Sequence, residues 1–139
     1  MNNLLGVFLI MSGYIVGLGA VTVIDILGFL GRKSSYWTEA TIRAHKVTKP
    51  LIWIGTALLC LGGIIIQLPQ YFFLIYFILI LNGLFLSFYV SPILLNLEKK
   101  GTSKVLLPES LQRKVFLSFI ISDLGWWGSL ILFLLFLNL

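Results

Sequence analysis

The sequence has few charged residues and few of the side chains that hold metals. Charged residues make up 11% of its 139 residues, and it contains one cysteine, one histidine and two methionines. A lone cysteine, Cys60, excludes an internal disulfide and a paired-thiol redox centre. A lone histidine, His45, excludes a haem held by two histidines of one chain, and a zinc or copper site would need ligands from distant segments. We therefore expect neither a metal nor a cofactor.

The chain consists mainly of long apolar runs. Hydrophobic residues make up 59% of the chain, against roughly 45–50% in soluble proteins. Four runs approach or exceed the roughly 20 residues that cross a bilayer as a helix: residues 4–30, 50–68, 71–95 and 115–139. A helix satisfies its backbone hydrogen bonds within one segment, as lipid requires. We predict an all-α integral membrane protein, a single domain of four transmembrane helices.

The basic residues predict the orientation of these helices. All 10 lysines and arginines lie in two loops, residues 31–49 and 96–114. The positive-inside rule makes both loops cytoplasmic and leaves the N- and C-termini outside the cytoplasmic membrane of a bacterium. We expect the loops to contact anionic lipid headgroups, and we expect no nucleic-acid partner. The first run has no basic n-region and no cleavage site, so we expect it to be retained.

The two halves of the chain share several features. In each loop a glutamate precedes an arginine by four residues, a favourable order for an ion pair on a helix: Glu39 with Arg43, and Glu109 with Arg113. The same offset aligns glycines of the two halves: Gly13 with Gly83, and Gly55 with Gly125. These matches suggest two repeated helical hairpins related by a parallel repeat.

Small residues recur on one face of the predicted helices. Membrane helices associate by close approach at such positions, because lipid is as apolar as leucine. The positions are Gly13, Gly17 and Gly28 in the first helix, Gly83 and Ser87 in the third, and Ser118, Ser122, Gly125 and Ser129 in the fourth. They predict a compact bundle, and they leave small faces for a homo-oligomer or another membrane-protein partner.

Asp25 and Asp123 are the only acidic residues inside the apolar runs. An ionisable residue at the bilayer centre costs on the order of 2–3 kcal/mol, and is by default a functional hypothesis. The alternative is a protonated or hydrogen-bonded carboxyl that holds helices together. If either aspartate titrates, it suggests proton or cation passage, with Asn82 and Tyr89 on one face of the third helix as polar neighbours.

Two other features invite a functional interpretation. His45 lies in the first cytoplasmic loop beside Arg43 and Lys46, and we expect it to face solvent. Trp126 and Trp127 lie at mid-membrane, where packing competes with a role in stacking on a lipid or a quinone. No constellation of serine nucleophiles, catalytic carboxylates or phosphate loops accompanies them.

Four short motifs carry a family resemblance: "GLGAVTVID", "WIGTALLCLGG", "LNGLFLSFYVSP" and "ISDLGWWG". Together they resemble a group of uncharacterised small bacterial four-helix membrane proteins, distantly similar to copper-resistance D-type membrane domains. The resemblance implies a four-helix architecture in which Asp25, Asn82, Gly83 and Pro92 are recurrent polar or helix-breaking features. It does not imply copper binding, because the chain lacks the intramembrane histidines and clustered methionines for that role.

Three functions remain open. The first is a non-enzymatic structural or interacting subunit of the membrane. The second is a small proton- or cation-linked transporter or channel that uses Asp25. The third is a membrane enzyme that acts on a lipid or quinone near Trp126 and Trp127.

Overall fold

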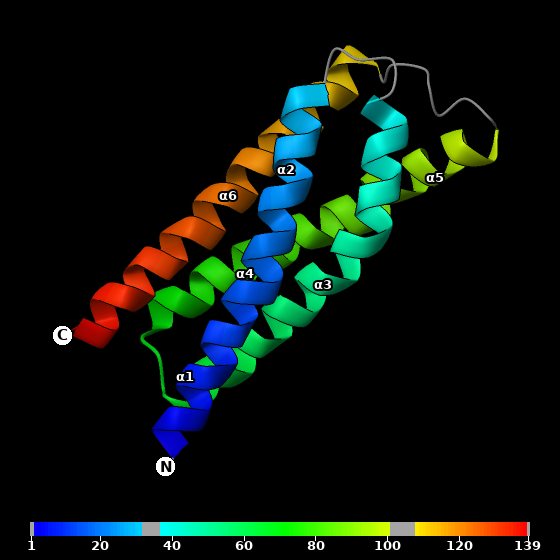
Figure 1. Ribbon diagram of the computed structural model, residues 1–139. Coiled ribbons are helices and arrows are strands. Elements are labelled where there is room, and N and C mark those ends of the chain that lie inside the picture. The colour runs from blue at the N-terminus through cyan, green and yellow to red at the C-terminus, as the bar shows by residue number, and fades with distance from the viewer. Residues whose placement is uncertain (1, 32–36, 101–107, 139) are drawn as a thin grey trace.

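The computed structural model describes residues 2–31, 37–100 and 108–138, and these are almost entirely helical (Figure 1). The first hairpin comprises α1 (Asn2–Gly13), a π-helical turn η1 (Tyr14–Leu18), α2 (Gly19–Gly31) and α3 (Trp37–Ile65). The second comprises α4 (Gln70–Phe85), the π-helical turn η2 (Leu86–Val90), α5 (Ser91–Lys99) and α6 (Glu109–Asn138). Both termini lie at one end of the bundle, which we call the termini end, and the opposite end is the loop end.

The described residues form an all-α bundle of four long helices, as predicted. Four of its segments are long and apolar enough to cross a membrane: Asn3–Phe29, Ile42–Ile65, Gln70–Asn96 and Glu109–Asn138. Many bulky apolar side chains on their outer faces are exposed, for example Leu4, Phe8 and Leu124. A bilayer would solvate such side chains, so the architecture is that of a multi-pass membrane protein.

The helices extend further into the predicted loops than their hydropathy indicates. α3 begins at Trp37 rather than at Pro50, and α6 begins at Glu109 rather than at Val115. Residues 37–49 and 109–114 contain no glycine or proline, so the helices continue beyond the apolar runs. Pro50 lies inside α3, where the missing backbone donor is tolerated as in other membrane helices. The predicted loops of residues 31–49 and 96–114 are therefore largely helical where the structure describes them.

Glycines bring the backbones of the first hairpin into direct contact. A Cβ atom on Gly55 would lie 2.6 Å from Gly17 Cα and 2.9 Å from the Gly13 carbonyl oxygen. One on Gly62 would lie 2.7 Å from the Gly6 carbonyl oxygen. Because no side chain fits between them, α1 and η1 pack against α3 along glycines.

Two separate clusters of apolar side chains fill the bundle. The larger belongs mainly to the termini end and includes Tyr14, Leu59, Tyr76, Trp126 and Phe133. The smaller belongs to the loop end and comprises Ile42, Val90, Leu94, Leu111, Val115 and Phe119. The cavity described below borders the second cluster.

A π-helical turn interrupts the first helix of each hairpin. Such a turn adds one residue to the helix and changes the direction in which all later side chains point. The two turns begin at Tyr14 and Leu86, two residues out of register with the predicted repeat, and the repeat stays a prediction.

Candidate functional site

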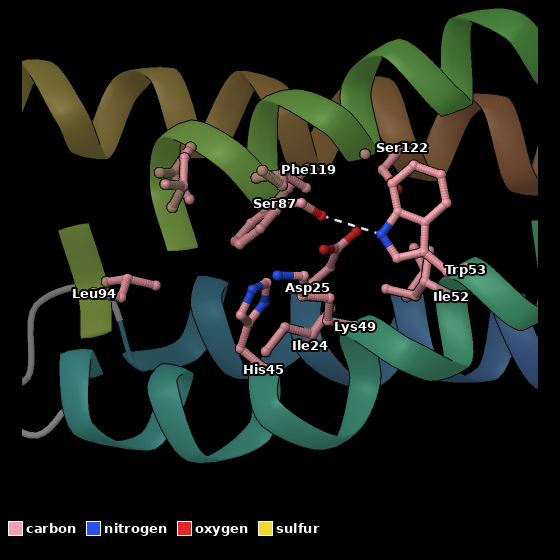
Figure 2. Close-up of a pocket in the computed structure, with 15 residues that line it drawn as sticks. Ile24, Asp25, His45, Lys49, Ile52, Trp53, Ser87, Leu94, Phe119 and Ser122 are labelled. Atoms are coloured by element: carbon pink, nitrogen blue, oxygen red, sulfur yellow. Dashed lines mark hydrogen bonds between the residues drawn. The ribbon is translucent and has the colours of Figure 1, made fainter. Parts of the chain in front are cut away.

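A cavity of about 50 Å³ lies inside the loop end, between α2, α3, the η2–α5 segment and α6 (Figure 2). Apolar side chains form most of its wall, among them Ile24, Leu86 and Val115. Three ionisable side chains also line it, namely Asp25, His45 and Lys49. A water molecule needs roughly 10–15 Å³ of such space, so the cavity has room for a few. We call it the inner cavity.

Asp25 is the most deeply buried of the three ionisable residues. It follows Val21 by one turn of α2, on the face that packs into the bundle, and only 7% of its surface is exposed. Its Oδ2 atom is buried and has no hydrogen-bond partner. Leaving a buried acceptor unpaired costs about 1–3 kcal/mol, so the position needs an explanation other than packing.

His45 does not face solvent, contrary to expectation. It lies on α3, because that helix begins at Trp37, and its buried Nε2 atom has no hydrogen-bond partner. Lys49 lies one turn further on, and both side chains point into the inner cavity with Asp25 (Figure 2). In the sequence, four residues separate His45 from Lys49 and Lys49 from Trp53. This spacing predicts a shared helix face where the segment is helical.

A hydrogen bond closes the far side of the cavity. Trp53 Nε1 donates to Ser87 Oγ at 3.1 Å, which joins α3 to η2 (Figure 2). Gly83 provides the space for the indole, because a Cβ atom there would come within 3.3 Å of the ring. Ser122, from α6, lines the cavity beside this bond. This side of the cavity thus combines the Trp53 indole of α3 with small residues of the α4–η2 segment and of α6.

Asp25 also lines a second space, a groove of about 510 Å³ between α2 and α6 that we call the lateral groove. Asp123 lines the same groove, and the two carboxyl groups lie close enough to interact. The structure thus brings together the two acidic residues that the sequence places in the apolar runs. Two carboxylates side by side repel each other unless a proton or a cation lies with them.

Asn82 and Tyr89 do not join the aspartates. Asn82 Nδ2 donates to the Ser118 carbonyl oxygen at 3.1 Å, and Ser118 Oγ donates to Asn82 Oδ1 at 2.6 Å, so this pair fastens α4 to α6. Tyr89 is 46% exposed and stacks on Phe85 with ring centroids 5.2 Å apart. Lys114 Nζ of α6 lies 5.7 Å from the centroid of the Tyr89 ring, so both residues face α6 but neither reaches the aspartates.

The remaining small residues lie at contacts between helices. Gly28 faces the Phe119 ring and Gly125 faces Leu79, in each case too closely for a Cβ atom. Ser129 Oγ donates to the Trp126 carbonyl oxygen of its own helix at 3.0 Å.

The two mid-membrane tryptophans have different environments. Trp126 is 1% exposed and packs against Gly17 in the core, whereas Trp127 is 46% exposed and lines the lateral groove. Only Trp127 could therefore contact a ligand that arrives from the bilayer.

The two predicted ion pairs at the loop end have different outcomes. Arg113 Nη2 lies 2.8 Å from Glu109 Oε1, on the exposed surface of α6. The Glu39 side chain lies outside the described residues, so its pairing with Arg43 stays a prediction.

No group of three or more histidine, cysteine, aspartate or glutamate side chains is arranged to hold a metal in the described part of the chain. The ionisable groups at the inner cavity are the carboxyl of Asp25, the imidazole of His45 and the ammonium group of Lys49. A comparison with protein-family models, curated proteins and solved structures finds no match to this chain.

Proposed function

We propose that this protein is a proton-linked transport protein of the membrane and that Asp25 takes up and releases the proton. The observation that carries the proposal is the unpartnered Oδ2 of Asp25, buried beside a cavity that also contains His45 and Lys49. A carboxyl group is an effective proton carrier only if its ionised form can be stabilised as well as its neutral form. Water in the cavity, together with the imidazole and the ammonium group, would provide that stabilisation.

A purely structural role for Asp25 has less support. A carboxyl that joins helices would be hydrogen-bonded to a neighbouring helix, as Asn82 is to Ser118. The carboxyl group of Asp25 does hydrogen-bond to Asp123 of α6, but its Oδ2 stays buried without a partner, which a purely structural carboxyl would not need. Membrane proteins place ionisable groups beside cavities where a proton or an ion passes.

The proposal includes a location and an orientation. Helical segments of the loop end carry Lys46, Lys99, Arg113 and Lys114, and Lys100 directly follows α5 (Figure 1). By the positive-inside rule this end faces the cytoplasm, against anionic headgroups, and both termini lie outside the cytoplasmic membrane. Asp25 would then exchange its proton near the cytoplasmic face. Association into a homo-oligomer or with another membrane protein remains part of the proposal.

Infrared difference spectroscopy on the reconstituted protein tests the proton site directly. We expect a carboxylic-acid band that disappears as the bulk pH is raised and returns as it is lowered. Asp25→Asn should remove that band, while Glu109→Gln, which alters an exposed acid, should leave it. If the band is absent from the wild type, or survives Asp25→Asn, Asp25 is not a proton carrier and the proposal is wrong.

A further inference from the structure

Two buried polar atoms at the inner cavity lack hydrogen-bond partners, Oδ2 of Asp25 from α2 and Nε2 of His45 from α3. Both side chains point into the cavity (Figure 2). Its volume of about 50 Å³ has room for a few water molecules, and a buried water molecule needs polar groups to hold it. Water there would bond to both side chains and connect the carboxyl group to the imidazole.

His45 also lines a second space, a groove of about 320 Å³ between α3 and α5 that we call the outer groove. Lys46 lines the outer groove but not the inner cavity, and its side chain is exposed. A lysine keeps its ammonium group in water, so the outer groove is reached by water at the loop end. Four side chains line both spaces and form the partition between them: His45, Lys49, Trp53 and Leu94.

Of these four partition side chains, His45 has the chemistry to pass a proton. A neutral imidazole has one N–H donor and one acceptor nitrogen. The ammonium group of Lys49 has donors and no acceptor, and Leu94 has neither. The indole of Trp53 is a donor only, and it already donates to Ser87. A proton that crosses the partition would therefore cross it at His45.

The lateral groove, on the other side of Asp25, is a poorer route for protons. Asp25 and Asp123 line it and are hydrogen-bonded to each other. The residues at its edge are between two-fifths and about half exposed on the apolar face of the bundle: Ile26, Phe29, Phe116, Ile120 and Trp127. Such a face contacts lipid, which has no water to deliver a proton.

We infer that His45 relays the proton between Asp25 and the outer groove, through water in the inner cavity. This rests on the proposed function and names the path of its proton. In uptake, one ring nitrogen of His45 accepts a proton from water in the outer groove. The other nitrogen releases its proton to water in the cavity, which passes one proton to the Asp25 carboxylate. The ring is neutral before and after, and its rotation restores the starting tautomer.

The groups around His45 leave this path open. The charged and titratable side chains that line the two spaces with it are Lys46 and Lys49 of α3 and Asp25 of α2. The η2–α5 segment and α6 contribute uncharged side chains, among them Ser87, Ser91 and Ser122. Asp25 is thus the proton acceptor that the inner cavity presents to His45.

Time-resolved infrared spectroscopy after laser release of a caged proton tests the relay on the full chain in non-ionic micelles. In the wild type we expect the carboxylic-acid band of Asp25 to rise after the release. A positioned proton-transfer group contributes roughly 10²–10⁴-fold to a rate, so His45→Ala should slow the rise by about a hundredfold or more. The final amplitude should persist, because Asp25 is intact. Added imidazole, which can occupy the space of the deleted ring, should restore most of the rate.

Two further variants separate the relay from a structural role of His45. His45→Gln fills the site and can bond to water, but an amide does not pass a proton, so this variant should also be slow. Thr48→Val is the matched control. Thr48 lies between His45 and Lys49 in the sequence, lines neither space, and donates to the Ala44 carbonyl oxygen at 3.0 Å. Its loss should leave the rate unchanged.

Two results would overturn the relay and leave the proton proposal intact. One is a wild-type rate in His45→Gln or His45→Ala, in which case a slow Asp123→Asn variant would move the path to the lateral groove. The other is a slow His45→Ala variant that imidazole does not restore, because the ring would then be needed only for structure. Failure of the proposed function is a different result, since the wild type itself would then show no Asp25 band that changes with pH.

Discussion

The termini end and the loop end of the bundle are packed in opposite ways. At the termini end Tyr14, Tyr76, Trp126 and Phe133 are at most 2% exposed, and the hydroxyl groups of Tyr14 and Tyr76 lie 3.4 Å apart. At the loop end the bundle contains a cavity, with the unpartnered Oδ2 of Asp25 and Nε2 of His45 at its wall. These two are the buried side-chain polar atoms without a partner in the part of the chain that the structure describes. The termini end is therefore closely packed, whereas the loop end contains a cavity and buried polar atoms without partners.

This difference indicates where stability and function reside. In lipid the hydrophobic effect does not drive helices together, so their association depends on dispersion energy from close packing, as at these glycines. Unpaired buried polar groups lower stability and persist where a function requires them. Substitutions at the two ends should therefore change stability in opposite directions, which the following predictions test.

The largest expected effect belongs to Gly55→Ala. A Cβ atom there would lie 2.6 Å from Gly17 Cα and 2.7 Å from Gly17 N, and a backbone contact cannot move aside. We expect a loss of about 3 kcal/mol in the free energy of unfolding, the upper range for overpacking, and a visibly lower melting temperature in micelles.

Gly19→Ala is the matched control, because a Cβ atom on that helical glycine meets nothing within 4 Å. We expect it to leave the unfolding free energy unchanged or to raise it by a few tenths of a kcal/mol. Equal effects of the two substitutions would show that the first hairpin does not pack on its glycines.

A smaller effect of opposite sign is expected for Asp25→Leu. The substitution removes the unpartnered Oδ2 atom together with the interaction of the carboxyl with Asp123, and the inner cavity has room for the larger side chain. Replacing buried ionic groups by apolar ones of suitable size often stabilises a protein by about 1–4 kcal/mol, and we expect the lower half of that range. Thermal unfolding in micelles measures it.

Asp123→Leu is the control for Asp25→Leu, and its gain should be smaller because Asp123 is only partly buried. If Asp25→Leu instead lowers the unfolding free energy by more than about 1 kcal/mol, the carboxyl holds the helices together. The structural role considered from the sequence would then replace the proton-linked one.

Much of the fold could be predicted from the sequence, because span length and hydropathy depend on the bilayer rather than on the partners of a residue. The inward direction of Asp25 could not be predicted, because at about 100° per residue this position lies outside the arc of the glycines of its helix. The position of His45 could not, because hydropathy locates the apolar run and not the polar turns before it. The proximity of Asp25 to Asp123 could not be predicted either, because it depends on how α2 is rotated about its axis relative to α6.

Tyr89 shows a second limit of sequence-based reasoning. A wheel of regular helical turns puts it on the face of Asn82, and both side chains do face α6, Tyr89 at Lys114 and Asn82 at Ser118. The periodicity could not show that neither side chain reaches the aspartates, because that depends on where the helices lie in the bundle.

The smallest effect is expected for Glu109→Gln, although it breaks the 2.8 Å contact with Arg113. Both side chains are 79% exposed, so water replaces the lost partner, and we expect a change of at most about 0.5 kcal/mol in the unfolding free energy, smaller still at high salt. Asp25→Leu provides the comparison, because a buried carboxyl with an unpartnered oxygen should matter more than an exposed carboxyl with a close partner. If Glu109→Gln lowers the unfolding free energy by 1 kcal/mol or more, regardless of salt, burial does not determine the importance of charge at the loop end.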